Sequence, residues 1–443
     1  MNSNIYSDIA VVAPEIVFPA GAKNLALWPV IACDQFTSEP EYWSETERLT
    51  EGVPSTAHLI LPEVYLDSMP ADAIDRKIAS INEHMRSYIE SNVVETLPAG
   101  FILLDRSTSL HPSRSGLMLA IDLEQYDFTP GNKSRIRATE GTVLSRIPPR
   151  VRIRKDALLE LPHIMLLIDD PAGLVIEKAL RDLRETVPSL YDVDLIQGGG
   201  HVTGYFTPAD SSVAQGIVSG LRDLLAASDD GFLFAVGDGN HSLATAKAHW
   251  EAIRGALTET ERGNHAARFA LVEVVNIHDK GLDFEPIHRV AFGLSVEGFY
   301  ASAGRYFADQ GFRFYSAEEF AQLPAPGSGV HVIPVLCGRE RYVMVLERPK
   351  HLLVVGSLQN FLDHLVSSDT ASIRVDYIHG EDSVANLARE GNTGFLLPAI
   401  SKDSFFATIS VEGVFPRKTF SMGEAFEKRY YMEAKRIASE VTV

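Results

Sequence analysis

A short polar turn between an apolar run and a helical pattern is the part of this sequence best placed to do chemistry. Residues 232–236 are apolar and long enough for one buried strand. Beyond the turn, Leu243, Ala246 and Trp250 recur at helical spacing. Glycines let a backbone approach a ligand closely, and the free N–H groups of a first helical turn attract anions. The turn that combines these features is Gly237, Asp238, Gly239, Asn240, His241 and Ser242.

Two other interpretations of this turn stay open. Gly, Asp, Asn and Ser are common between a strand and a helix because they turn the chain and cap the helix. The pattern Gly237-x-Gly239-x-x-Ser242 also matches part of the dinucleotide fingerprint but lacks its third glycine. The turn is therefore either a ligand site or an ordinary capped connection.

An arginine-rich segment offers a partner for an anion. Residues 133–155 contain eight Lys or Arg and one acid. Arg150, Arg152 and Arg154 alternate, so a strand would place them on one face. In a chain with net charge −19, such a face favours an anionic ligand. Pairing with the chain's own carboxylates, or a charged edge strand, would also explain the pattern. We assign Arg146 and Arg150 to the candidate site.

Two acids are candidates for a general base. Asp34 directly follows an apolar run, where a parallel strand would end, and such positions often contact ligands. A turn or cap role for Asp34 is the alternative. Glu140 lies amid positive charge, so its carboxylate should stay ionised at neutral pH. Glu140 could serve as a base, a metal ligand or a salt-bridge partner, and the sequence does not choose between the two acids.

Other polar clusters are less specific. His288 and Arg289 follow Pro286 and are expected on a turn, where they offer imidazole and guanidinium side by side. Asp169 and Asp170 follow an apolar run, where a helix cap is favoured over a Mg²⁺ site. The sequence lacks the H-E-x-x-H, G-x-S-x-G and P-loop motifs. Common zinc proteases, elbow-type serine hydrolases and P-loop enzymes therefore have no support.

The elements that must position these residues indicate an α/β (α+β) protein with mixed sheets and flanking helices. We expect an α/β ligand-binding unit at residues 1–290 and a smaller α+β unit at residues 291–443. In the first unit we expect strands at 100–104, 117–123, 163–168 and 268–277, and helices at 71–94 and 173–186. In the second we expect strands at 330–336 and 341–346, and helices at 294–310, 358–365, 385–389 and 422–437.

Composition limits the partners. The 443 residues are 45% hydrophobic and 22% charged, which is ordinary for a globular protein. The net charge of −19 argues against nucleic acid and anionic membranes as partners. Two distant cysteines make no disulfide framework, and no signal sequence or apolar run near about 18 residues occurs. We expect a cytoplasmic protein with a small anionic ligand, and we leave its oligomeric state open.

Taken in order, these pieces resemble the domain-of-unknown-function-1015 family of prokaryotic proteins. The segment GDGNHSLATAK at residues 237–247 is similar to that family's D-G-x-H-R-x-x-x-A signature. Glu140-Gly141-Thr142 precedes an arginine-rich segment and then Leu167 to Pro171 in a similar order. Pro286 to Arg289 resembles P-T-H-R, and Pro416 to Thr419 resembles a C-terminal P-x-K-S/T.

The strand–turn–helix element is also similar to the phosphate-binding element of the ParB/sulfiredoxin superfamily, which includes free serine kinases. This resemblance implies a nucleotide or phosphoryl site at Asp238, Gly239 and His241. Ser242 stands where an arginine is expected, so one bidentate phosphate clamp is missing. Arg289, or an arginine at 146–154, would have to replace it.

The first hypothesis is a small-molecule kinase or related phosphotransferase that uses ATP or ADP with Mg²⁺. In it the turn holds the phosphates, Arg146, Arg150 or Arg289 stabilises the transferring group, and Glu140 or Asp34 takes the proton. The second is a non-catalytic nucleotide- or metabolite-binding regulator. The third is a metal-dependent hydrolase that draws on Asp238, His241, Asp169 and His288.

Overall fold

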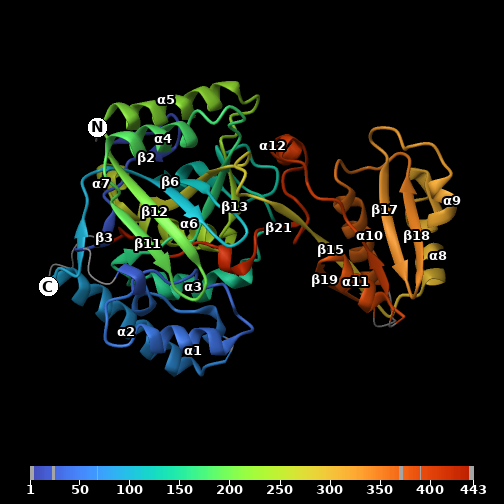
Figure 1. Cartoon of the computed structure of the whole chain (residues 1–443), viewed down its shortest axis with the longest axis horizontal. Helices are drawn as coiled ribbons and strands as arrows, with labels where there is room; N and C mark the ends of the chain where they lie inside the picture. Colours follow the sequence, from blue (N-terminus) through green and yellow to red (C-terminus); the bar gives the residue numbers. More distant parts are fainter. Residues whose placement is uncertain (1–3, 22–24, 67, 369–372, 390, 439–443) are drawn as a thin grey trace. The chain divides into compact units, whose positions relative to one another are not determined.

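The chain folds into two compact units, and unit 2 is inserted into the sequence of unit 1. The structure, a computed structural model, describes residues 4–21, 25–66, 68–368, 373–389 and 391–438. Unit 1 comprises residues 1–283 and 423–443, and unit 2 comprises residues 284–422 (Figure 1). The expected units were 1–290 and 291–443. Here the chain instead leaves unit 1 after Asp283 and returns to it at Gly423.

Unit 1 is built on an eleven-stranded mixed sheet, so the predicted mixed α/β class is confirmed. The strand order is β11-β12-β5-β6-β14-β10-β13-β8-β7, with β2 against β6 and β1 against β2. Only β10 with β14, β13 with β8, and β7 with β8 pair in parallel. The strands are β1 Ile5–Tyr6, β2 Val11–Val12, β5 Gly100–Ser107, β6 Arg114–Asp122, β7 Tyr126–Asp127, β8 Ile136–Ala138, β10 Met165–Ile168, β11 Tyr191–Leu195, β12 Gly200–Pro208, β13 Phe234–Asp238 and β14 Phe269–Asn276.

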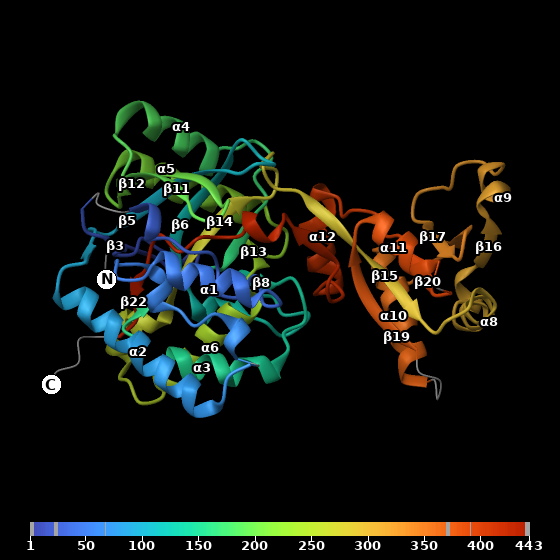
Figure 2. The same cartoon turned by 60° about the horizontal axis from the view of Figure 1, so that its bottom comes forward.

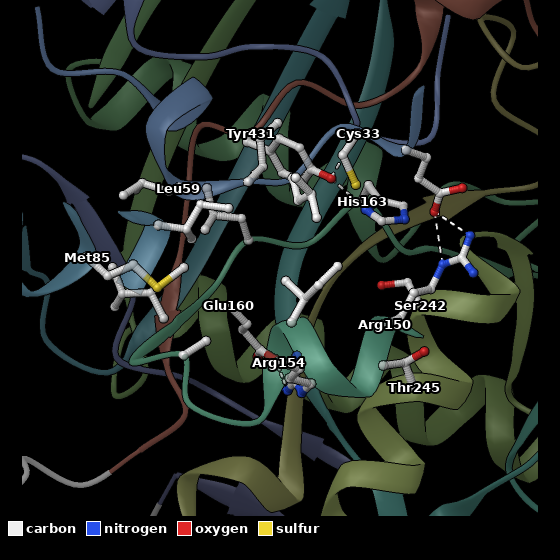
Figure 3. Close-up of a pocket in the computed structure, with 18 of the residues that line it drawn as sticks. Cys33, Leu59, Met85, Arg150, Arg154, Glu160, His163, Ser242, Thr245 and Tyr431 are labelled. Atoms are coloured by element: carbon white, nitrogen blue, oxygen red, sulfur yellow. Dashed lines mark hydrogen bonds and ion pairs between the residues drawn. The ribbon is translucent and has the colours of Figure 1, made fainter. Parts of the chain in front are cut away.

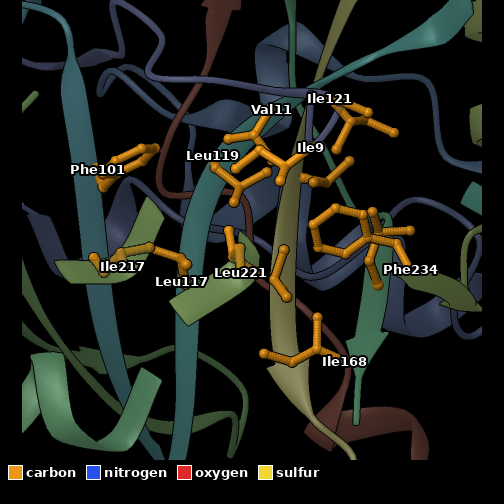
Figure 4. Packing of buried hydrophobic residues seen from close by; sticks show 14 of the residues in the cluster. Ile9, Val11, Phe101, Leu117, Leu119, Ile121, Ile168, Ile217, Leu221 and Phe234 are labelled. Atoms are coloured by element: carbon orange, nitrogen blue, oxygen red, sulfur yellow. The ribbon is translucent and has the colours of Figure 1, made fainter. Parts of the chain in front are cut away.

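Helices cover both faces of this sheet, because its central strands are apolar on both sides. Along β5, Phe101 and Leu103 face one core, which includes residues of α4 and α5 (Figure 4). Ile102 and Leu104 face the opposite core, which includes residues of α1 and α2. Alternate side chains of a strand point to opposite faces, so both cores are needed to bury β5. The helices are α1 Pro40–Leu49, α2 Ala71–Glu90, α3 Ile147–Arg154, α4 Ile176–Thr186, α5 Ser212–Ala227, α6 Asn240–Arg254 and α7 Glu259–Asn264.

Short elements complete unit 1. Two two-stranded sheets pair β3 Val17–Pro19 with β4 Val94–Thr96, and β9 Leu159–Glu160 with β22 Lys435–Arg436. The short 3-10 helices are η1 Leu25–Leu27, η2 Thr56–Leu59, η3 Glu63–Tyr65, η4 Leu123–Gln125, η5 Leu144–Arg146, η6 Ala266–Arg268 and η8 Ala425–Glu427.

Residues 147–154 of the arginine-rich segment form helix α3, so the strand considered for Arg150, Arg152 and Arg154 is wrong. Prolines at the start of α3 favour a helix, because they fix the backbone torsion where no N–H partner is needed. Arg150 and Arg154 therefore share a helix face, and Arg152 does not join them. Arg150 pairs with Glu63 and Arg154 with Glu160, while the exposed Arg152 pairs with Asp75. The alternative of pairing with the chain's own carboxylates is thus the observed one for these three.

The C-terminal segment, residues 423–438, runs through unit 1 instead of forming the helix expected at 422–437. Its main chain bonds to early strands and loops: Val17 N donates to Ala434 O at 2.8 Å, and Tyr431 N donates to Val30 O at 2.9 Å. Its apolar side chains are buried among those of α1, α2 and the sheet. The apolar spacing suits a helix, but these distant main-chain partners and the burial they bring favour an extended path.

A buried charge network fixes the C-terminal segment. Arg429 pairs with Glu273 of β14 at 2.6 Å and also with Glu433, and it donates to the Pro162 carbonyl at 2.9 Å. Burial opposes the ionised form of Glu273, yet Arg429 and Arg114 hold the pKa of this carboxyl below its usual value. The Arg429, Glu273 and Glu433 side chains are each 4% exposed or less. Each charge therefore depends on its partner.

Unit 2 is an α+β unit with a seven-stranded sheet. The order is β16-β18-β17-β20-β15-β19, with β21 against β15. One core holds residues of α8 and α10 against the sheet, and a smaller one holds residues of α11 (Figure 2). The elements are β15 Phe284–Phe292, α8 Val296–Tyr306, η7 Ala308–Gln310, β16 Phe312–Ser316, α9 Ala317–Ala321, β17 His331–Cys337, β18 Glu340–Leu346, α10 Val354–Ser368, β19 Arg374–His379, α11 Glu381–Ala388, β20 Thr393–Phe395, α12 Lys402–Glu412 and β21 Phe420–Met422.

Within the described residues, none of the helices is both long enough and apolar enough to cross a membrane.

We expect Arg429→Ala to lower the free energy of unfolding of unit 1 by about 3–5 kcal/mol, because Glu433 would be left buried without its cation and Glu273 would keep only Arg114, 3.7 Å away. Urea denaturation followed by tryptophan fluorescence measures this, since all three tryptophans, Trp28, Trp43 and Trp250, belong to unit 1. The control is Arg152→Ala, which removes an exposed pair worth about 1 kcal/mol or less. Equal effects of the two substitutions would contradict a structural role for the buried network.

Candidate functional site

The predicted strand, glycine turn and helix are confirmed at β13, Gly239 and α6. Gly239 has φ +76°, in the left-handed region that favours glycine. A Cβ at this position would lie 2.9 Å from Ile164 Cα, which is closer than a Cβ can approach backbone. The close packing of the turn against the residue before β10 therefore requires glycine, and it fixes where α6 begins.

The N-terminus of α6 lacks a side-chain cap. No side chain accepts a hydrogen bond from the first turn, because the residue at the cap position is Gly239. Asn240 Oδ1 and Thr142 Oγ1 are buried, and neither has a hydrogen-bond partner in the described part of the chain. Uncapped N–H groups carry the positive end of the helix dipole, and such a terminus attracts an anion.

The loop after β8 covers this helix terminus. Strand β8 is parallel to β13, with Ala138 opposite Val236, so both strands end at the same edge of the sheet. Glu140 follows β8 by two residues. Further along, the Val143 N–H donates to His241 Nε2 at 3.2 Å. An accepting Nε2 carries no proton, so this hydrogen bond favours the neutral imidazole with its proton on Nδ1.

Two arginines of the loop and α3 act on His241. Burial and the positive charges of Arg146 and Arg150 lower the pKa of His241 to about 4. Arg146 is exposed, and its guanidinium has no hydrogen-bond or ion-pair partner among the described residues. Arg150 is paired with Glu63 at its Nε, 2.9 Å from Oε1, and also donates to the Arg146 carbonyl. Arg146 is thus available to an anion, and Arg150 is already neutralised.

Asp238 forms an ion pair with Lys428 of the C-terminal segment. Lys428 Nζ lies 3.1 Å from Asp238 Oδ2, and the Gly239 N–H donates to Oδ1 at 2.8 Å. Burial opposes the ionised form, yet Lys428 and the Gly239 N–H keep the pKa of Asp238 below its usual value. The carboxylate is therefore ionised at neutral pH, and it orders the turn through Gly239.

Asp34 belongs to the same cluster. Its Oδ2 lies 3.7 Å from His163 Nε2, and its negative charge partly opposes the lowering of the His241 pKa. His163 Nδ1 is hydrogen-bonded to the Tyr431 hydroxyl at 2.7 Å. The same hydroxyl accepts from the Cys33 N–H at 3.1 Å. A carboxylate, an imidazole and a phenol are thus linked beside the turn.

A cavity of about 140 Å³ adjoins this cluster (Figure 3). Apolar side chains form much of its lining, and the polar or charged lining residues are Cys33, Glu63, Arg150, Arg154, Glu160, His163, Ser242, Thr245 and Tyr431. Helices α3 and α6 lie side by side at its wall (Figure 2). Through Ser242, the first turn of α6 therefore faces both the candidate anion site and the cavity.

The structure brings together some of the predicted residues and separates others. Asp34, Arg146, Arg150 and His241 interact, and they lie with the turn itself. His288 and Arg289 belong to unit 2 and lie on strand β15, so the expected turn at these residues was wrong. His288 Nδ1 accepts from the Leu397 N–H, and Arg289 Nε donates to Gln359.

Three residues of the cluster were missed. His163 lies two residues before β10, a buried strand that pairs with β13, and this position was the available signal. Lys428 and Tyr431 carry no local signal, because they reach the site only through the return of the chain from unit 2. The residues considered for a metal-dependent hydrolase do not lie together either. Asp169 follows the far end of β10, where it pairs with His278.

One comparison with known proteins identifies a family, and the similarity to solved structures is weak. A family model described as "Protein of unknown function (DUF1015)" matches residues 16–365. A search of curated proteins found no match. Similar solved structures include a conserved hypothetical protein from Pyrococcus furiosus (TM-score 0.35, 10% identity, 71% of this chain and 93% of that chain), a free serine kinase in complex with AMP (0.37, 10%, 71% and 90%) and a C-terminally truncated SbnI from Staphylococcus aureus (0.35, 10%, 71% and 85%). Likenesses this weak carry no argument about what unit 1 binds.

We expect Gly239→Ala to lower the free energy of unfolding of unit 1 by about 1–3 kcal/mol, because alanine is strained at a positive φ. Gly255→Ala at the other end of α6 is the matched control. Gly255 has φ −64° and open space around it, so its free energy of unfolding should stay the same or rise by up to about 1 kcal/mol. Tryptophan fluorescence reports both, since Trp250 lies on α6. Similar losses for both variants would contradict the requirement at Gly239.

We expect the His241 imidazole to stay neutral until the pH approaches about 4 in an NMR titration. The unfolded chain binds this proton first, so the His241 contribution to stability should fall as the pH drops from about 6.5 toward 4. Arg146→Ala should raise the pKa of His241 by removing a nearby positive charge. Arg152→Ala, on the same helix but paired with Asp75, should leave it unchanged. A normal His241 pKa in the wild type would show that the cluster does not form.

Proposed function

The chain belongs to the DUF1015 family of proteins of unknown function, and we propose that its unit 1 is a small-molecule phosphotransferase. In this proposal ATP or ADP with Mg²⁺ binds at the N-terminus of α6, and the phosphoryl group passes to a hydroxyl of a small molecule. We also propose that β13, the turn at Gly239 and α6 together resemble the phosphate-binding element of the ParB/sulfiredoxin superfamily.

One observation carries the proposal: an uncapped helix terminus, an unpaired cation and unpartnered buried oxygens occur together. The first turn of α6 has no side-chain cap, and Arg146 has no partner within the described residues. Asn240 Oδ1 in this turn is buried without a partner among the described residues, and so is Thr142 Oγ1 in the loop after β8, next to the residue whose N–H donates to His241. A phosphate would satisfy the N–H groups and the guanidinium, since both donate to anionic oxygen.

The roles of the remaining groups follow from their charge states. His241 is neutral, so it does not repel the Mg²⁺ ion that would accompany the nucleotide. Its Nδ1–H can donate a hydrogen bond. Arg146 would stabilise the negative charge of the transferring group. Asp34 would accept the proton of the acceptor hydroxyl, because Gln35 Nε2 and His163 contact its carboxylate and no lysine or arginine of the described residues pairs with it.

The residues present also fit Mg²⁺. This ion is commonly held by one or two protein oxygens together with phosphates and water. Asn240 Oδ1 needs a partner, and Glu140 follows the parallel neighbour of β13 at the same sheet edge. These two residues would hold the ion, whose charge would draw the phosphates into the site. Asp238 is less suited, because Lys428 already pairs with it.

We expect millimolar ATP or ADP with Mg²⁺ to raise the melting temperature, since a ligand that binds only the folded state stabilises it. Arg146→Ala should weaken nucleotide binding about ten-fold or more, as the loss of a charged hydrogen bond predicts. Arg152→Ala is the matched control on the same helix. Titration calorimetry measures both, and no binding to the wild type would refute the proposal.

Transfer itself is tested with labelled ATP or ADP and a panel of hydroxyl-bearing metabolites, including amino acids. Asp34→Asn should retain nucleotide binding but lower the transfer rate about a hundred-fold or more. Glu140→Gln should instead raise the Mg²⁺ concentration required. Nucleotide binding without transfer to any acceptor would favour a nucleotide-binding regulator over an enzyme.

A further inference from the structure

The cavity beside α6 is apolar at one end and polar at the other. In Figure 3, Met85 and Leu59 lie at one side, and Arg150, Ser242 and Thr245 lie at the opposite side. Met85 is 3% exposed and Leu59 is 3% exposed, so the apolar end belongs to the core between α2 and the sheet. The remaining apolar lining is Ile60, Leu61, Leu66, Ile81, Ile153, Ala157, Leu159 and Leu161.

Most of the charged groups of the cavity wall are paired within the protein, although the buried Arg154 Nε has no hydrogen-bond partner among the described residues. Glu160 accepts from the Leu271 N–H at 2.8 Å and is paired with Arg154 and Lys435. Arg150 is paired with Glu63. These groups therefore make little demand on a ligand. The Ser242 hydroxyl differs, because it has no hydrogen-bond partner among the described residues and stands on the first turn of α6.

The size of the cavity limits what it can hold. A dry apolar cavity of about 150 Å³ binds one benzene molecule. The present cavity, of about 140 Å³, is therefore large enough for one six-membered carbon ring or a short alkyl chain. A sugar or a charged amino-acid group would bury hydroxyl or ammonium groups against Leu59, Met85 and their neighbours without partners, which is costly.

We propose that this cavity holds a compact apolar group, about the size of one benzene ring, of the molecule that is phosphorylated. The inference rests on the proposed phosphate site at α6. The acceptor hydroxyl lies at the polar end beside Ser242, and the apolar group fills the end lined by Leu59 and Met85. The substrate class is thus a small hydroxy compound with an aromatic or aliphatic body, and the product is its phosphate monoester.

Binding of two monoesters with the same head group tests this directly. Phenyl phosphate places a ring beyond the phosphate, and glycerol phosphate places a polar body of similar length. We expect phenyl phosphate to bind the full chain at least about ten-fold more tightly than glycerol phosphate, because only its ring gains from leaving water. Calorimetry with inorganic phosphate gives the contribution of the head group alone.

Two substitutions on one helix separate the cavity from the rest of α3. Ile153 lines the cavity, and Val151 on the same helix does not. Ile153→Phe should fill the space and abolish the preference for phenyl phosphate, while the affinity for inorganic phosphate stays the same. Val151→Phe should retain the preference. A preference that survives Ile153→Phe at full strength would overturn the assignment of the cavity.

Binding of benzene, followed by NMR of the Met85 methyl group, is a readout that needs no anion site. If inorganic phosphate binds but neither benzene nor the ring of phenyl phosphate adds anything, the cavity proposal is wrong and the phosphate site stands. If benzene shifts the Met85 signal but no phosphate binds, the cavity is a ligand pocket and the proposed function fails. If neither binds, both proposals fall.

Discussion

The pairing of Arg429 with Glu273 is the interaction on which unit 1 depends. It joins the last segment of the chain to a central strand of the sheet, and it does so with charges that water does not reach. The gain from such a pair is small against its cost of desolvation, but the loss of Arg429 would leave Glu433 buried without its cation and Glu273 with only Arg114, 3.7 Å away. Its effect is therefore positional, because it sets the path of residues 428–431. That path carries Lys428 to Asp238 and Tyr431 to His163.

Charge balance then decides which groups at the site can meet a ligand. Lys428 neutralises Asp238, and Glu63 neutralises Arg150, so these groups mainly hold loops and helices in place. Arg146 and the first turn of α6 lie outside these pairs. The chain has a net charge of −19, but an unpaired guanidinium beside an uncapped helix terminus makes this part of the surface locally positive. The adjacent cavity adds an apolar surface to this positive region.

Much of the scaffold followed from local patterns, whereas the completed site did not. Continuous apolar runs predict β5, β6 and β14, and helical spacing predicts α2 and α4. The glycine turn after residue 236 is visible because it interrupts both patterns. The helix α3 was missed because alternate arginines were given more weight than the prolines at its start. The path of residues 423–438 could not be predicted, because its hydrogen-bond partners lie about four hundred residues away along the chain, as Val17 does for Ala434. Lys428, Tyr431 and the ion pairs of the cluster depend on that path.

The insertion of unit 2 between β14 and the C-terminal segment has a consequence for biosynthesis. A ribosome-bound chain that has just completed unit 2 contains Glu273 and Asp238 but lacks Arg429 and Lys428. Asp238 is then without Lys428, and Glu273 faces only Arg114, until residues 428 and 429 leave the exit tunnel. Unit 1 therefore cannot mature in the usual N-terminal-first order, whereas residues 284–422 are complete earlier. A chain truncated after residue 422 would therefore contain the whole of unit 2 but would lack the segment that completes the ion pairs of unit 1.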